Sequence, residues 1–157
     1  MLKEKHLNND ATSFNTGANC SIEELTERME TVAADNQIPL TIQQDTIKVG
    51  GMFNSRELVC LVLSHPEHVR DYYQIVVIPG DGESIAATMG VSKQMKKFSI
   101  AERAKEQRRG KSLSFKIGHM ATSSLFLIGK NKDKLTMEQN YYDSVLGVIG
   151  YCLEAEE

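Results

Sequence analysis

The sequence predicts an α+β domain, in which an antiparallel sheet of about five strands is packed by helices. Two segments carry apolar residues at helical spacing, near each end of the chain. Several short apolar or alternating runs, separated by Gly and Pro, are typical of strands. The 157 residues, 41% of them hydrophobic, suit one core. The expected order is helix, three strands, helix, two strands, helix (α-β-β-β-α-β-β-α).

The N-terminal region divides into a polar stretch and a helix. Residues 1–20 are rich in Asn, Ser, Thr and Gly, so we expect a flexible arm there. A single α+β domain is expected over 21–157. Ser21 begins a capping box with Glu24, which marks the start of a helix.

Three strand segments are expected to follow this helix. Residues 40–49 flank a turn-like Gln44–Asp45 pair and predict a short hairpin. Residues 57–64 form an apolar run, which is typical of a strand covered on both faces. Residues 72–78 predict a further strand that ends at a Pro-Gly turn.

The second half is expected to begin with a helix over 84–109, which has a thin apolar stripe and ends at Gly110. Two strands are expected within 112–128, although the same apolar residues also fit one helical face. The last helix is predicted from a broad apolar stripe that runs from Met137 to Cys152, with a second capping box at Thr136.

This element order, from about residue 21 to 153, resembles that of the small dimeric secretion chaperones of bacteria and related chaperone-like domains. The resemblance covers the order of elements alone, so it concerns the fold and implies little about function.

Composition excludes several classes of protein. No apolar run approaches 18 residues, so we expect no membrane-spanning segment. The N-terminus lacks the apolar core of a secretory signal, and three widely spaced cysteines suit reduced thiols, so we expect a cytoplasmic protein. The absence of tryptophan and the 6% aromatic content argue against a domain that stacks single-stranded bases.

His65 and His68 are weak candidates for metal ligands. They stand three residues apart across Pro66, whereas zinc proteases place two histidines four residues apart on a helix. We therefore expect a structural turn, with no metal and no cofactor.

No catalytic motif is present. Gly110-Lys111-Ser112 resembles the end of a phosphate-binding loop, but Lys105 stands where that loop needs glycine. Ser123 and Ser124 lack the Gly-x-Ser-x-Gly context, and Cys60 lies in an apolar run, so an inert thiol is expected. No residue is assigned a catalytic role.

The basic segment 93–116 is the one strong charge asymmetry. It holds nine lysines and arginines against two glutamates, a net charge of +7, whereas the whole chain has −3 and the remainder therefore −10. Such asymmetry can mark an anionic partner. The candidate partner-binding or anion-binding residues are Lys93, Lys96, Lys97, Arg103, Arg108, Arg109 and Lys111.

These observations favour a non-catalytic protein-binding or assembly module of the adaptor or chaperone kind, which we expect to self-associate as a homodimer. The alternative is a nucleic-acid or polyanion binder that uses the basic segment. A second alternative is an enzyme whose site is assembled from residues far apart in the sequence.

Overall fold

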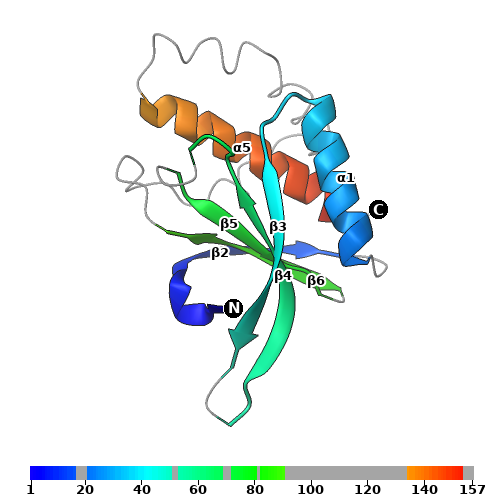
Figure 1. Ribbon diagram of the computed structural model, residues 1–157, viewed down its shortest axis with the longest axis vertical. Coiled ribbons are helices and arrows are strands. Elements are labelled where there is room, and N and C mark those ends of the chain that lie inside the picture. The colour runs from blue at the N-terminus through cyan, green and yellow to red at the C-terminus, as the bar shows by residue number, and fades with distance from the viewer. Residues whose placement is uncertain (17–20, 51–52, 69–71, 81, 91–133, 154–157) are drawn as a thin grey trace.

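The computed structural model describes residues 1–16, 21–50, 53–68, 72–80, 82–90 and 134–153, and it confirms the α+β class. A six-stranded sheet carries two long helices, α1 and α5, on one face (Figure 1). In chain order the elements are β1 (Leu2–Lys3), the 3-10 helix η1 (Glu4–His6), β2 (Leu7–Asn15), α1 (Ile22–Asp35), β3 (Thr41–Val49), β4 (Arg56–Ser64), β5 (Gln74–Ile78), β6 (Glu83–Met89) and α5 (Lys134–Leu153).

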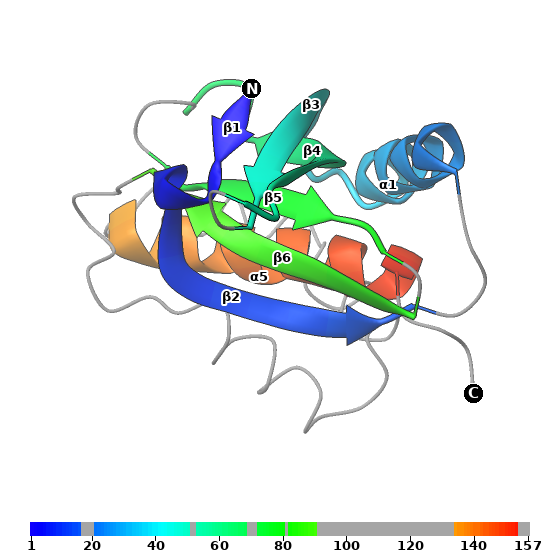
Figure 2. The same ribbon diagram turned by 90° about the horizontal axis from the view of Figure 1, so that it is seen from below.

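The sheet has the strand order β1-β3-β4-β5-β6-β2. Neighbouring strands are antiparallel, apart from the short parallel pair of β1 and β3. The two outer strands of this order, β1 and β2, follow each other in the sequence and are joined only by η1. The sheet therefore curls toward a barrel, and the first residues of the chain lie where its two edges approach each other (Figure 2).

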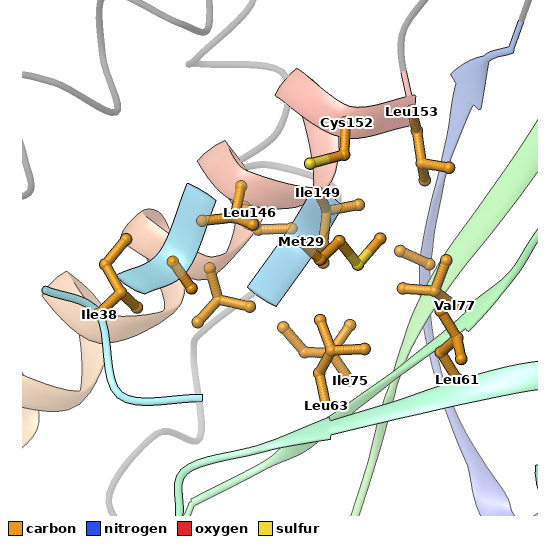
Figure 3. Packing of buried hydrophobic residues seen from close by; sticks show 14 of the residues in the cluster. Met29, Ile38, Leu61, Leu63, Ile75, Val77, Leu146, Ile149, Cys152 and Leu153 are labelled. Carbon is orange, nitrogen blue, oxygen red and sulfur yellow. The ribbon is translucent and has the colours of Figure 1, made fainter. Parts of the chain in front are cut away.

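The larger core lies between the sheet and the two helices (Figure 3). Leu61 and Leu63 of β4 and Val77 of β5 point from the sheet toward Met29 of α1 and Ile149 of α5. All five side chains are buried, which removes their apolar surface from water and anchors both helices.

A second, smaller core lies on the opposite, concave face of the sheet. It is formed by the buried side chains of Ile47, Cys60, Val62 and Val76. Since successive residues of a strand point to opposite faces, β4 contributes Cys60 and Val62 here and Leu61 to the helix side. Residues 57–64 were expected to be covered on both faces of the strand. This is found from Cys60 onward, whereas Glu57 and Val59 are exposed.

The first helix begins as the sequence predicts. The Ser21 hydroxyl accepts a hydrogen bond from the backbone N–H of Glu24 at 3.1 Å, and this satisfies one of the free donors of the first turn. Leu25, Met29 and Ala33 form its buried face.

The expected flexible arm over residues 1–20 differs from the structure over residues 1–16, and residues 17–20 lie outside the described residues. Residues Leu7–Asn15 form β2, which pairs with β6, and Phe14 is only 2% exposed in the larger core. One large aromatic side chain, together with backbone hydrogen bonds to a long strand, offsets the cost of ordering a polar segment.

Two other expectations about the strands are wrong. Residues Thr41–Val49 form one continuous strand, with no turn at Gln44–Asp45, because each residue pairs with β4 in an unbroken register. Residues Glu83–Met89 form β6, whereas a helix was expected from residue 84, because this segment lies between β5 and β2 and bonds to both. The rest of the expected helix and both strands expected within 112–128 lie outside the described residues.

The last helix is confirmed, but it begins at Lys134, so Thr136 lies within its first turn and is not the N-cap. From Tyr141 to Gly150 nearly every residue of α5 is buried, so the helix lies inside the molecule. Among the described residues, no helix is long and apolar enough to cross a lipid bilayer.

Between residues 41 and 89 of the described chain four strands follow α1, where three strands and then a helix were expected, so the element order departs from the one that resembles secretion chaperones.

Candidate functional site

The concave face of the sheet, opposite the helices, contains a cavity of about 750 Å³. Small-molecule sites in proteins commonly have about 300–1,000 Å³. The cavity is bounded by η1, by β2, by the concave face of β5 and β6, and by the β3–β4 hairpin. Its lining residues are Glu4, Leu7, Asn8, Ala11, Val49, Gly50, Asn54, Arg56, Leu58, Ile78, Ile85 and Ala87.

Strand register explains why this lining is mostly aliphatic. Ala11 lies opposite Ala87, and Ile78 lies opposite Ile85, so each pair projects from the same face of the sheet. Leu58 shares that face in β4, next to the smaller core. Ile85 is 40% exposed although it is a large apolar residue, because it faces the open cavity.

The N-terminal segment closes one side of the cavity. A carboxylate oxygen of Glu4 accepts a hydrogen bond from the backbone N–H of Gly50 at 3.1 Å, which fastens η1 to the β3–β4 hairpin. The N-terminal ammonium group of Met1 lies 3.9 Å from the Asp45 carboxylate, and Leu2 pairs with Ile47.

Gly50, whose backbone N–H binds Glu4, has a backbone conformation that favours glycine. Its φ of 97° lies in the region that L side chains avoid, and a Cβ atom there would lie 2.5 Å from the carbonyl oxygen of Asn54. Only glycine fits this turn, which holds Asn54 and Arg56 at the cavity.

Polar groups occupy the rim of the cavity. Asn8 donates hydrogen bonds to the Gly90 carbonyl at 2.7 Å and to the Thr88 hydroxyl at 3.2 Å, so its side-chain amide is held in place. Arg56 is exposed, and within the described part of the chain its guanidinium forms no ion pair. It is the one cationic side chain among the lining residues.

The chemistry of the neighbouring Cys60 is that of an inert thiol, as expected. Burial, with a smaller contribution from the Asp45 carboxylate, raises the pKa of Cys60 to about 11. Cys60 is therefore protonated at neutral pH and a poor nucleophile.

A second cluster of interest surrounds His65 and His68, whose ring centroids lie 4.7 Å apart. His68 stacks on Tyr72 at 4.6 Å, and His65 packs against Tyr141 at 4.8 Å. The backbone N–H of Glu67 donates to Nδ1 of His65 at 3.0 Å, as in a structural turn. Burial and the neighbouring His68 lower the pKa of His65 to about 4, so this ring is neutral at pH 7.

The two histidines thus lie together, but the described residues include no group of three or more His, Cys, Asp or Glu side chains that could hold a metal ion. That His65 and His68 bind no metal remains a prediction.

The basic segment lies outside the described residues. The structure therefore places none of its candidate residues, namely Lys93, Lys96, Lys97, Arg103, Arg108, Arg109 and Lys111, and their role remains a prediction.

Sequence reasoning missed the cavity altogether. Arg56 and Ile85 carry no motif, and β6 was expected to be a helix. The residues that line the concave face of a curled sheet can be identified only when the pairing of its strands is known.

Comparisons with protein-family models, with curated proteins and with solved structures found no match.

Proposed function

We propose that this protein is a non-catalytic binding domain, and that the concave cavity holds a small, largely apolar ligand. The observation that supports the proposal is a cavity of about 750 Å³ whose lining is mainly aliphatic and whose polar groups are confined to its rim. Desolvation of such a ligand against seven aliphatic side chains would supply the affinity.

The lining also supports binding rather than catalysis. Among its described residues there is no histidine, cysteine, serine or aspartate, and its one carboxylate, Glu4, bonds to a backbone N–H of the closure. A nucleophile paired with a base is therefore missing from this lining.

The test is a titration with Nile red, a neutral apolar dye whose fluorescence rises in an apolar site. We expect saturable binding by the wild-type protein. Ala11→Phe, which places a ring in the cavity, should weaken binding roughly tenfold. The matched control is Ala34→Phe on the exposed surface of α1, which should bind as the wild type does.

Absence of saturable Nile red binding by the folded wild-type protein would overturn the proposal. Equal weakening by both Ala→Phe variants would also overturn it, because the effect would then not depend on the cavity.

A protein partner is a second candidate, supported by the β3–β4 hairpin. Figure 1 shows this hairpin extending beyond the rest of the sheet, away from the helices. Phe53 in its turn is 94% exposed, and phenylalanine is among the aromatic residues that are enriched at protein interfaces. Purification of the tagged protein from its own cells should then recover a partner that Phe53→Ser does not retain.

Self-association remains part of this second proposal. It was expected because β4 and the last helix have wide apolar surfaces, but both are largely covered within a single chain. Light scattering at micromolar concentration should detect a dimer if the proposal is right, and a monomer would contradict it.

A further inference from the structure

We propose that the ligand of the concave cavity is an amphiphile with a carboxylate head group, such as a fatty acid. In this arrangement Arg56 binds the head group and the aliphatic residues of β4, β5 and β6 contact the chain. The inference rests on the proposed function and adds the chemical class of the ligand.

Arg56 stands at one end of an aliphatic surface. It lies opposite Val49 in the β3–β4 register, so both residues project from the concave face. Leu58 is the next residue of β4 on that face, and Ile78 and Ile85 continue the apolar lining on β5 and β6. A charge followed by a continuous apolar surface matches a molecule with a polar head and an apolar chain.

The guanidinium group is available for a ligand. Within the part of the chain that the structure describes, it forms neither an ion pair nor a side-chain hydrogen bond. Glu4, the one carboxylate in the lining, instead accepts from the backbone N–H of Gly50. Guanidinium presents a planar fork of N–H donors that matches a carboxylate in a bidentate arrangement.

A ligand with a cationic head group fits the cavity less well than one with a carboxylate. A cationic amphiphile would need Glu4, whose carboxylate fastens the N-terminal segment to Gly50. A cation bound to Glu4 would compete with the hydrogen bond from the Gly50 backbone N–H, whereas a carboxylate bound to Arg56 would displace no described interaction.

The experiment compares three ligands of the same chain length, decanoate, decanol and decylamine, by displacement of Nile red from the wild-type protein and two variants. Arg56→Gln removes the charge. Arg28→Gln makes the same change on the exposed surface of α1, away from the cavity.

We expect Arg56→Gln to weaken decanoate binding roughly threefold to fivefold, the upper part of the range for an exposed ion pair, and to change decanol binding less than about twofold. Arg28→Gln should alter neither. Added salt should weaken decanoate binding to the wild type but not to Arg56→Gln.

Several outcomes would overturn the inference while leaving the proposed function intact. One is that Nile red binds but decanoate fails to displace it. Others are that Arg56→Gln weakens the binding of decanoate and decanol equally, or that decylamine displaces Nile red from the wild type more readily than decanoate does. Failure of the wild type to bind Nile red would instead contradict the proposed function itself. Because Arg56 is exposed, its variant should unfold at nearly the wild-type temperature, which a thermal scan checks.

Discussion

Acidification should destabilise this protein through His65. The side chain is only 8% exposed, packs among His68, Tyr72 and Tyr141, and has a pKa lowered from 6.5 to about 4 by burial and by the neighbouring His68. The unfolded chain therefore takes up a proton near pH 6.5, whereas the folded chain resists protonation until about pH 4. Stability due to this group is complete above pH 6.5 and falls as the pH decreases toward 4.

The magnitude follows from the difference between the two pKa values. Each unit corresponds to about 1.4 kcal/mol, so the loss should be about 2 kcal/mol at pH 5 and about 3 kcal/mol at pH 4. The carboxylate of Glu67 acts in the opposite direction and is already included in the pKa of about 4.

The assay is urea unfolding of the wild type and of His65→Gln at several pH values between 7 and 4. At pH 7 the variant should be the less stable, because it loses the packing of the imidazole ring. The difference in the free energy of unfolding between the wild type and the variant should narrow by about 3 kcal/mol as the pH falls to 4, because glutamine does not titrate. A gap that stays constant across this range would refute the reasoning, because burial of a neutral imidazole would then not govern the response to acid.

Two further changes test the fold. Phe14→Ala should lower the free energy of unfolding by about 3–5 kcal/mol, because it empties a site in the larger core; Phe53→Ala, at a 94% exposed position, is the matched control and should have almost no effect. If Phe14→Ala is equally harmless, β2 does not dock as described. Gly50→Ala should cost about 1–3 kcal/mol, because φ is 97° and the new Cβ would lie 2.5 Å from the Asn54 carbonyl oxygen. Gly82→Ala, with φ of 77° but open space around its Cβ, should cost less, and equal thermal midpoints for the two variants would contradict the steric argument.

The elements that the sequence predicts well are those whose signals are local. Ser21 and Glu24 define the start of α1 within four residues, and the apolar run at residues 57–64 identifies β4 without reference to any partner. The stripe that includes Val145 and Ile149 likewise identifies α5, since helical periodicity is a property of one segment.

The elements that the sequence misplaces depend on partners far along the chain. Residues Leu7–Asn15 contain too few apolar side chains to predict a strand, and they form one only because β6 is there to pair with them. In β6, Ala86 and Ala87 have no strong strand signal, and two flanking strands decide their conformation. The candidate site is equally hard to predict from the sequence. Arg56 and Ile85 line the same cavity only because strand pairing brings two distant segments together.

The position of β2 has a consequence for how the chain folds. The hydroxyl groups of Thr16 and Ser84 lie 2.7 Å apart although 68 residues separate them in the sequence. During synthesis β2 must therefore wait until β6 has been made before the two strands can pair. Such long-range pairing is entropically costly and tends to be slow, whereas the β3–β4 hairpin can form from adjacent segments. The wall of the cavity that β2 and η1 provide should consequently be assembled late. During refolding, the ability to bind ligand should therefore appear with the slowest phase and not with the earlier formation of helix.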